Sequence, residues 1–504
     1  MFKKILIANR GIIRLACIQA SRELGVVSSV FHVAADLRGV GERFADEVCV
    51  LETKDPFSAF YDAEAIATLA QDIGADAVHP GFGFLAESHD FMGKLRELGI
   101  RLISSASDDA VAQIQNKPLL KSLAQSIGVR AVPGTNAVDN AASLRQVAQE
   151  LHYPLIVKPV SGVGGVGLSV VLKAEELEAA FVRATSRMQR TGVVEEEVFV
   201  EEFLSGARHI EVPVLRDRFG NVAVFPEIEA SVQRRFQKFL SVSPAQFISE
   251  RQRNYIATSA RRIIEELEYI GLASVEFLVL GDDVFFLEIN SSIQPNHLLM
   301  GRLTGINLVR EQIRAIAGER VAFSVGELQA RGVVVGLVVN AEDPTADFAP
   351  SPGRVDEFSM FSVPGVDVLT TCSGGKELSS YYDPMIAYVT GYGLTFDEVH
   401  RRMLSALECF YISGVSSNLS LLRAVMGSRR FVEEGFKVSD LRSATELEAL
   451  MRESRPGMEE LAAALAALAI ENDTGVKQII SQEGEGYSLW NFAARFFERG
   501  RIEI

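Results

Sequence analysis

Residues 284–297 read VFFLEINSSIQPNH, an apolar and aromatic strand that runs into a polar loop. The strand carries Glu288 and Asn290 two residues apart, and strict alternation would point both, together with Phe286, to one face of a sheet. A carboxylate on such a strand costs free energy unless a cation or hydrogen bonds satisfy it. The stretch therefore predicts the metal-holding edge of a site.

A second predicted strand, residues 274–280, precedes it across the turn at residues 281–283. The two strands form a predicted hairpin that directs Glu276 and Glu288 to one face. Two carboxylates and Asn290 are what Mg²⁺ takes from a protein when nucleotide phosphates complete its octahedral shell. The alternative is a pair of surface carboxylates on an exposed hairpin, and the surrounding aromatic residues argue against it.

Length and composition narrow the class of protein. A chain of 504 residues is expected to form several domains, and 48% hydrophobic with 23% charged residues is ordinary for a soluble globular protein. The net charge of −16 argues against a nucleic-acid binder and against attachment to an anionic membrane. The four cysteines show no CxxC spacing, which favours reduced thiols and predicts a cytoplasmic protein. No run reaches the roughly 18 apolar residues of a membrane span.

Residues 1–113 alternate strands with helices, beginning with a strand at residues 4–8 and a helix at residues 12–24. This alternation predicts a parallel sheet covered on both sides, whose ligands bind at the carboxyl ends of the strands. Residues 9–11 and 79–84 would lie at that rim. Within the second segment the alternative is an ordinary glycine turn with a structural histidine.

A second predicted domain covers residues 114–329, with a lid at about residues 132–203. A strand ending at Lys158 is followed by a glycine-rich loop through Gly167, which suits a flap over phosphates because glycines expose backbone N–H groups and lysine adds charge. The motif GxxxxGK[ST] is absent, so this is no P-loop. The alternative is a flexible hairpin loop.

Three further segments carry polar side chains with a possible ligand role. Residues 198–204 predict a strand and a hinge that could offer a backbone donor and acceptor to an adenine edge. His209 and Glu211 share one face of the following predicted strand. Residues 233–238 are basic and amide-rich, and the alternative there is a solvated charged loop.

The remainder of the chain predicts two more units. Residues 330–443 contain predicted strands at 333–339 and 366–371 and a helix at 396–408. Residues 444–504 are rich in Ala, Leu and Glu and predict a helical tail, whose apolar stripe favours packing or partner contact over a cofactor site.

The order of these motifs resembles that of the biotin carboxylase family, the ATP-grasp subunit of acetyl-CoA and related acyl-CoA carboxylases. The resemblance runs from Met1 to about Ser439. The motifs that carry it are IANRG (7–11), HPGFGFL (79–85), Lys117, the loop 158–167, RHIE (208–211), QRR (233–235), QK (237–238), Glu276, EIN (288–290) and NAEDP (340–344).

The resemblance implies an α/β ATP-grasp fold with an N-terminal doubly wound parallel-sheet domain, a mobile lid and a C-terminal biotin-carboxylase-type domain. It implies Mg²⁺ or Mn²⁺ at Glu276, Glu288 and Asn290. The ATP contacts that it implies are Lys117, Lys158, Gly164, Gly165, Gly167, Glu201, Glu202, Phe203, Leu204, His209, Gln233 and Leu278. The family phosphorylates bicarbonate with ATP and passes the CO₂ to biotin on a carrier. The carrier's Met-Lys-Met signature is absent here, so biotin would arrive on a separate chain.

The departures from the family pattern fall almost entirely on the carboxylation side. Ser292 stands where an arginine would pair with bicarbonate, and Asn296 where a glutamate would deprotonate it. An amide cannot act as a general base at neutral pH, and serine cannot replace a bidentate guanidinium. Val338 replaces the arginine near biotin, whereas Lys238 and Gln294 remain as the candidate catalytic residues.

Three more positions lose the basic side chain of the family pattern: Val166 stands where an arginine is usual, Glu202 where a lysine is usual and Phe236 where a histidine is usual. Since the metal residues stand, the pattern predicts nucleotide binding without standard carboxylation. Three hypotheses remain open: a divergent working biotin carboxylase, an ATP-grasp ligase for another carboxylate or acceptor, and a non-catalytic subunit of a carboxylase-like assembly. The resemblance also implies a homo-oligomer and a carrier or carboxyltransferase-like partner.

Overall fold

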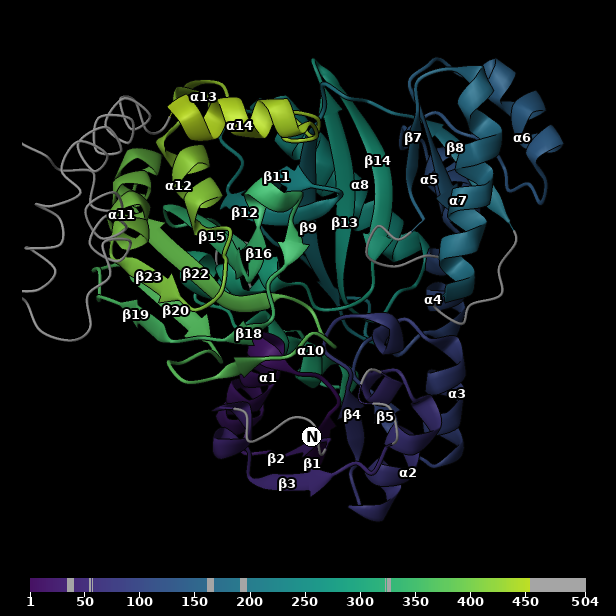
Figure 1. Ribbon diagram of the computed structural model, residues 1–504. Helices are drawn as coiled ribbons and strands as arrows, with labels where there is room; N and C mark the ends of the chain where they lie inside the picture. Colours follow the sequence, from purple (N-terminus) through teal and green to yellow (C-terminus); the bar gives the residue numbers. More distant parts are fainter. Residues whose placement is uncertain are drawn as a thin grey trace, which may run out of the picture.

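A computed structural model describes residues 1–33, 40–53, 56, 58–160, 167–190, 197–321, 323 and 328–453. The chain is a mixed α/β protein, with an N-terminal unit at the bottom of Figure 1, a large sheet through the centre and a small sheet at the upper right. Among the helices of these ranges, none combines the length and apolar character needed to cross a membrane.

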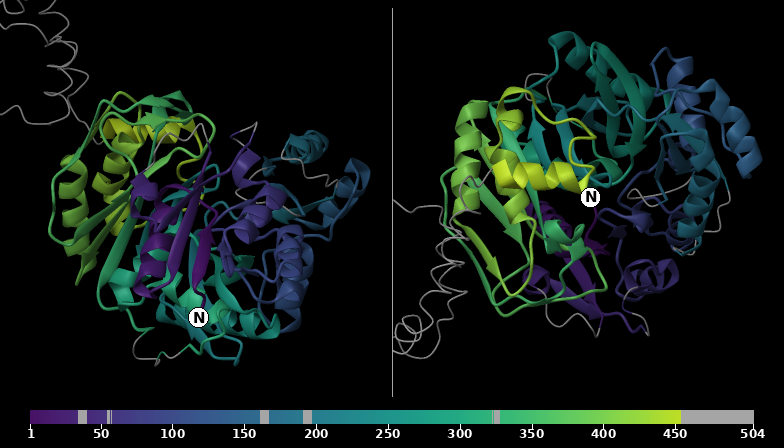
Figure 2. Two further views of the ribbon diagram at one scale, coloured as in Figure 1. Left: turned by 90° about the horizontal axis from the view of Figure 1, so that it is seen from below. Right: turned by 45° about the horizontal axis from the view of Figure 1, so that its top comes forward.

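The N-terminal unit is a five-stranded parallel sheet in the order β3-β2-β1-β4-β5. Its strands are β1 (Lys4–Ile7), β2 (Val27–His32), β3 (Glu47–Val50), β4 (Ala77–His79) and β5 (Arg101–Leu102). Its helices are α1 (Gly11–Glu23), α2 (Ala63–Asp72) and α3 (His89–Glu97). In both views of Figure 2 these purple strands lie between the green C-terminal unit and the blue small-sheet unit.

Alternation along β1 explains why both faces of this sheet are covered. Ile5 and Ile7 are buried in one core together with α1, whereas Leu6 is buried in a second core together with α2 and α3. Successive side chains of a strand point to opposite faces, so an unbroken apolar run requires a layer on each side. The predicted doubly wound parallel sheet is confirmed.

The large sheet is antiparallel and runs in the order β14-β13-β9-β11-β12-β15-β22-β20, with β10 pairing β9. Leu240 of β12 pairs with Leu337 of β15, so the sheet continues without a break from the central unit into the C-terminal one. The strands are β9 (Arg208–Arg216), β10 (Val222–Val224), β11 (Ile228–Arg234), β12 (Gln237–Ser243), β13 (Gly271–Leu280), β14 (Asp283–Asn290), β15 (Val333–Asn340), β20 (Val366–Thr370) and β22 (Met385–Gly393).

A β-bulge in β14 corrects the prediction that Phe286, Glu288 and Asn290 share one face. Phe286 pairs with Phe277, but Glu288 pairs with Glu276, so β14 holds one extra residue at Leu287. Phe286 is consequently buried in the core under the sheet, while Glu288 and Asn290 face Glu276 on the other side. A bulge shifts the alternation by one residue, which no periodic pattern anticipates.

Helices cover the core side of the large sheet and the C-terminal unit. Helix α8 contacts β9, β10 and β14, and α11 contacts β22 and β15. The helices are α4 (Asp108–Gln115), α5 (Lys117–Ser126), α8 (Glu250–Glu266), α9 (Leu299–Thr304), α10 (Leu308–Ile316), α11 (Phe396–Glu408), α12 (Leu419–Gly427), α13 (Arg429–Glu433) and α14 (Ala444–Glu453). Short strand pairs complete the C-terminal unit: β16 (Glu342–Asp343) with β17 (Ala349–Pro350), β18 (Gly353–Arg354) with β21 (Glu377–Leu378), and β19 (Glu357–Met360) with β23 (Phe410–Ser413).

The small sheet has the order β7-β6-β8 and a core of its own. It comprises β6 (Leu155–Pro159), β7 (Ser169–Val171), β8 (Val198–Glu202), α6 (Ala141–Val147) and α7 (Leu177–Arg190). Residues 161–166 of the predicted glycine-rich loop, with Gly164, Gly165 and Val166, lie outside the described residues, as do residues 454–504 of the predicted helical tail.

Phe286→Ala is expected to lower the free energy of unfolding by about 3–5 kcal/mol, because the ring is fully buried and its removal leaves a cavity. The ring packs edge-on against Phe277 at a centroid distance of 6.0 Å. Urea denaturation followed by circular dichroism measures the change. Phe361→Ala, at a ring that is 73% exposed, is the matched control and should change stability by no more than about 0.5 kcal/mol. Equal effects of the two changes would contradict the placement of Phe286.

Candidate functional site

The rim of the N-terminal sheet is tied together by Asn9. Its Nδ2 donates to the carbonyl oxygens of Pro80 at 2.7 Å and Phe82 at 2.9 Å. A Cβ added at Gly81 would lie 2.5 Å from Cγ of Asn9, so the close approach that requires this glycine is to a side chain of the protein. His79 is fully buried, and its Nδ1 accepts from the backbone N–H of Gly81. The contacts favour the structural interpretation of Gly81 and His79.

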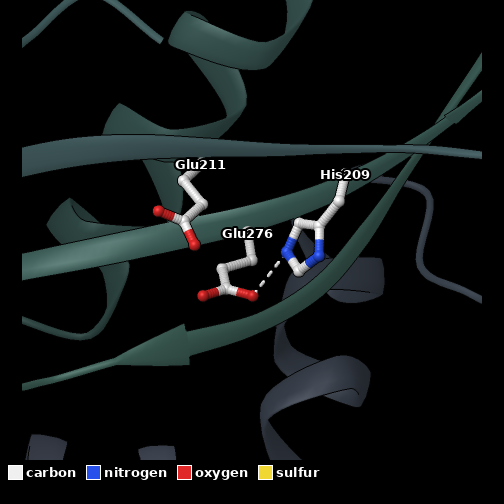
Figure 3. Close-up of side chains that lie close together, drawn as sticks. All are labelled: His209, Glu211 and Glu276. Atoms are coloured by element: carbon white, nitrogen blue, oxygen red, sulfur yellow. Dashed lines mark hydrogen bonds and ion pairs between the residues drawn. The ribbon is translucent and has the colours of Figure 1, made fainter. Parts of the chain in front are cut away.

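Glu276 lies at the centre of a buried polar network on the other face of the large sheet. His209 Nε2 donates to it at 2.6 Å, and Gln233 Nε2 lies 3.3 Å from Nδ1 of the same ring. Asn290 Nδ2 donates to Glu276 at 2.5 Å. Figure 3 shows how His209, Glu211 and Glu276 converge from neighbouring strands. Their potential ligand atoms all lie within 4.8 Å of one another.

Lys238 of β12 is the cation that balances these carboxylates. Its ammonium donates to Glu276 at 2.6 Å and also contacts Glu211. Burial opposes the charge on Lys238, but the two carboxylates outweigh it and hold the pKa of Lys238 above its usual value. Burial likewise opposes the charge on Glu276, yet Lys238 and His209 keep the pKa of Glu276 below its usual value. Glu276 is therefore ionised at neutral pH.

Glu288 forms the second half of the predicted metal pair. It lies directly opposite Glu276 in the hairpin, and Lys117 of α5 approaches it at 3.2 Å. Burial raises the pKa of Glu288, but Lys117 and more distant lysines outweigh burial and lower it. Two ionised carboxylates side by side, with an amide next to them, form an oxygen-rich donor set suited to a hard divalent cation.

Glu87 is a further carboxylate near this pair. It hydrogen-bonds the side chain of Ser292 and lies in the field of Lys117 and Glu288. Burial is the main cause that raises the pKa of Glu87 to about 7. The charge of Glu87 can therefore change near neutral pH.

On the predicted nucleotide-binding side, Glu201 of β8 forms ion pairs with two lysines. Lys158 approaches one oxygen of Glu201 at 2.8 Å, and Lys121 of α5 contacts the other. Glu202 points elsewhere, since it accepts from the backbone N–H of His152 at 3.0 Å. The predicted contacts Phe203, Leu204 and Leu278 pack together in a separate apolar cluster, and Gly167 packs against Pro159.

Asn296, one of the substituted carboxylation positions, lies in a closed network of hydrogen bonds. Asn296 is buried and donates to Glu211 at 3.0 Å. Its oxygen accepts from Ser241 at 2.9 Å and from Tyr388 at 3.3 Å. Three hydrogen bonds with the protein therefore hold the amide of Asn296 in place.

The structure also places the retained Gln294 and the substituted Ser292, Val338 and Phe236. Gln294 donates to the hydroxyl of Ser292 at 3.1 Å, so the side chain kept at 294 contacts the one lost at 292. Val338 is buried directly opposite Tyr388 in the β15–β22 pair. Opposed side chains in an antiparallel pair share a face, which places Val338 on the side from which Tyr388 reaches Asn296. Phe236 lies in the β11–β12 turn with a φ of 66°.

The structure thus brings Glu276, Glu288, Asn290, His209 and Gln233 together. Sequence reasoning did not assign a role to Glu211, Lys121, Glu87, Ser241 or Tyr388. Lys121 could have been found, because it follows Lys117 by one helical turn. Glu211 was noted as sharing a face with His209 and as part of the motif at residues 208–211, but it was given no role. Glu87, Ser241 and Tyr388 come from distant segments, and no local spacing predicts their position.

Three parts of the chain match models of known protein families. Residues 1–109 match the family model of the biotin carboxylase N-terminal domain, and residues 337–442 match that of the C-terminal domain. Residues 116–323 match the ATP-binding domain of the carbamoyl-phosphate synthase L chain. Together the three matches span most of the sequence. The chain belongs to the biotin carboxylase family.

Two curated relatives of the family align along nearly their whole length. Biotin carboxylase 1 of Bacillus subtilis is 32% identical over 444 residues, which cover 88% of this chain and 98% of the relative. The small subunit of 2-oxoglutarate carboxylase from Hydrogenobacter thermophilus is also 32% identical, with 86% of this chain and 92% of the relative covered.

A solved structure supports the same fold. The biotin carboxylase domain dimer of Hydrogenobacter thermophilus 2-oxoglutarate carboxylase, in complex with MgADP, ADP and bicarbonate, matches with a TM-score of 0.85 and 31% identity. The match covers 90% of this chain and 99% of that one. The expected α/β ATP-grasp class, with an N-terminal parallel sheet and a biotin-carboxylase-type C-terminal domain, is confirmed.

Proposed function

We propose that this biotin carboxylase family member binds ATP with Mg²⁺ or Mn²⁺ and that its standard carboxylation of biotin is weak or absent. The donor set of Glu276, Glu288 and Asn290 fits the metal, because both carboxylates are ionised and lie side by side on the hairpin. Lys117 and Lys238 neutralise the pair and would orient the phosphates. When bound, ATP supplies the phosphoryl group and the metal its Lewis acidity.

Different residues of the chain would bind the different parts of the nucleotide. Lys158 would supply a point charge to the phosphates, with Gly164, Gly165 and Gly167 as backbone donors. His209 and Gln233 form a hydrogen-bonded pair beside Glu276 that would face the ligand. The backbone at residues 201–204 would take the adenine edge, with Leu278 packing nearby.

The observation that carries the second half of the proposal is the bonding of Asn296. Its amide is committed to Glu211, Ser241 and Tyr388, and it has no group that can accept a proton. Ser292 offers a hydroxyl already shared with Gln294 and Glu87, and Val338 offers no charge at all. Lys238 retains an ammonium group near Asn296, but two carboxylates hold it. Positions 296 and 292 therefore offer a bicarbonate ion neither a general base nor a guanidinium group.

The test is the rate of ADP release by the purified chain with Mg²⁺, with and without bicarbonate and free biotin. Bicarbonate and biotin are expected to stimulate the rate less than about 2-fold, since both the base and the anion-binding arginine are lost. Robust stimulation by both compounds would overturn the proposal. Binding of MgATP, measured by calorimetry, is expected to persist, and its loss would overturn the first half.

A second candidate function is phosphorylation of a different carboxylate by the same ATP-grasp machinery. It is favoured by the retention of Lys238 and Gln294 beside the metal pair, because these two side chains can still hold an acceptor anion. A panel of small carboxylic acids in the ADP-release assay distinguishes it from a non-catalytic role. A strong response to one acid supports the ligase, and tight MgATP binding without turnover supports a non-catalytic subunit of a carboxylase-like complex.

Assembly is part of the proposal. The structure from Hydrogenobacter thermophilus is described as a dimer, and the relative from the same organism is named as the small subunit of a carboxylase. We therefore expect a homo-oligomer whose partner is a carrier protein or a carboxyltransferase-like subunit, with biotin supplied on the carrier.

A further inference from the structure

Lys121 is a buried lysine to which the proposed chemistry assigns no part. Its ammonium contacts one oxygen of Glu201, while Lys158 holds the other oxygen at 2.8 Å. The Glu201 side chain is 1% exposed, and the two lysine side chains are 9% and 10% exposed. One carboxylate thus serves two ammonium groups inside the protein. In Figure 1 the three elements concerned, α5, β6 and β8, belong to the blue region at the upper right.

An ordinary buried ion pair does not need the second lysine. Lys158 and Glu201 alone would already be neutral, and a second ammonium in a place shielded from water costs free energy. Burial is the largest influence on Lys121 and lowers its pKa to about 8, although Glu201 and the more distant Glu288 act in the opposite direction. The chain therefore keeps a costly cation here, and the cluster of Lys121, Lys158 and Glu201 carries one positive charge in excess.

The consequence appears when Lys158 is required elsewhere. If Lys158 turned from Glu201 towards a phosphate with no other cation present, Glu201 would be left as an unpaired buried carboxylate, which is strongly unfavourable. With Lys121 in place, Glu201 keeps a partner and the excess charge of the cluster is available to an anion. Glu201 holds both lysines through separate oxygens, so one contact can open while the other stays.

We propose that Lys121 is a positioning residue that neutralises Glu201 and thereby frees Lys158 to bind the nucleotide phosphates. This inference rests on the proposed function, since it requires a phosphorylated ligand at Lys158. The inference predicts that Lys121 contributes to the affinity for the phosphates of the ligand and does not contribute to the affinity for its nucleoside part.

The experiment compares MgATP and adenosine as ligands of the Lys121→Met variant by isothermal titration calorimetry. The affinity for MgATP is expected to fall ~10–100-fold, because Lys158 stays locked to Glu201, while the affinity for adenosine changes less than ~2-fold. Lys121→Arg keeps a cation beside Glu201 and should restore MgATP binding to within ~3-fold of the unaltered chain.

Two more variants separate this role from simple damage to the fold. In Lys121→Met/Glu201→Gln the buried carboxylate is gone, so Lys158 is free again and MgATP affinity should recover to within ~5-fold. Lys94→Met removes an ion-paired lysine on α3, in the N-terminal unit, and should leave both affinities unchanged.

Equal losses for MgATP and adenosine in Lys121→Met, unchanged MgATP affinity in that variant, or no recovery in the double variant would each overturn the inference while the proposed function stands. Failure of the unaltered chain to bind MgATP would overturn the proposed function, and the inference with it.

Discussion

Glu288→Gln is expected to weaken binding of ATP ~100-fold in the presence of Mg²⁺, equivalent to about 2.7 kcal/mol. Glu288 pairs across the hairpin with Glu276, and both carboxylates are ionised in the folded protein. A glutamine keeps the shape but removes one of the two charges that attract the metal, and with it the carboxylate that Lys117 approaches. Calorimetric titration with ATP in Mg²⁺ and in EDTA measures the change, which should be confined to the Mg²⁺ arm.

The matched control for this change is Glu227→Gln. Glu227 is also buried and ion-paired, but with Arg253 and away from the metal pair. Its substitution should lower thermal stability and leave MgATP affinity within ~2-fold of the unaltered chain. If Glu288→Gln behaved like Glu227→Gln, the carboxylate pair would be structural and the metal assignment would be wrong.

The second large effect expected is a gain of activity. The double substitution Ser292→Arg/Asn296→Glu should raise bicarbonate-dependent ADP release ~10²-fold, because it supplies both a guanidinium for the anion and a proton acceptor. The surroundings can receive these side chains. Glu87 lies against Ser292 as a counter-ion for the arginine, and Ser241 and Tyr388 already donate towards the oxygen at position 296.

The same geometry predicts that Asn296→Glu alone does not raise bicarbonate-dependent ADP release. The amide that now donates to Glu211 would become a second carboxylate facing it, at a cost of about 1–3 kcal/mol from the lost hydrogen bond alone. Thermal denaturation should show the single variant to be less stable than the double one.

The matched control is Ser292→Met/Asn296→Gln, which adds similar volume without charge and should show no response to bicarbonate. A response of that control, or no response of the charged pair, would contradict the view that charge at these two positions is what the site lacks. If the charged pair is silent, Val338→Arg is the next change to add, because Val338 faces the same network through Tyr388.

Much of this protein could be predicted from local patterns. The apolar run at residues 5–8 required a layer on both faces, and the structure places Ile5 and Leu6 in different cores. The helix expected at residues 396–408 begins and ends where predicted, since Thr395 caps it and its apolar positions repeat with helical spacing. These features depend on residues that are close together in the sequence, and local sequence patterns therefore predict them.

In the candidate site, too, some residues could be predicted from local patterns and others could not. Glu276, Glu288 and Asn290 could be predicted as metal ligands because a strand that carries carboxylates among aromatic residues is costly without a cation. Neither the partners of Asn296 nor the shared lysines of Glu201 could be found in that way, since Ser241, Tyr388 and Lys121 lie 55, 92 and 80 residues from the groups that they contact.

The stretch 284–297 contains both outcomes. Its sequence alone determined that a strand with two potential metal ligands runs into a loop without a carboxylate, because these are properties of the residue types. Only the tertiary structure decided which way the side chains face. The bulge at Leu287 turns Phe286 into the core and Glu288 and Asn290 towards Glu276, since pairing with β13 on one side and packing over the core on the other cannot both be met by regular alternation.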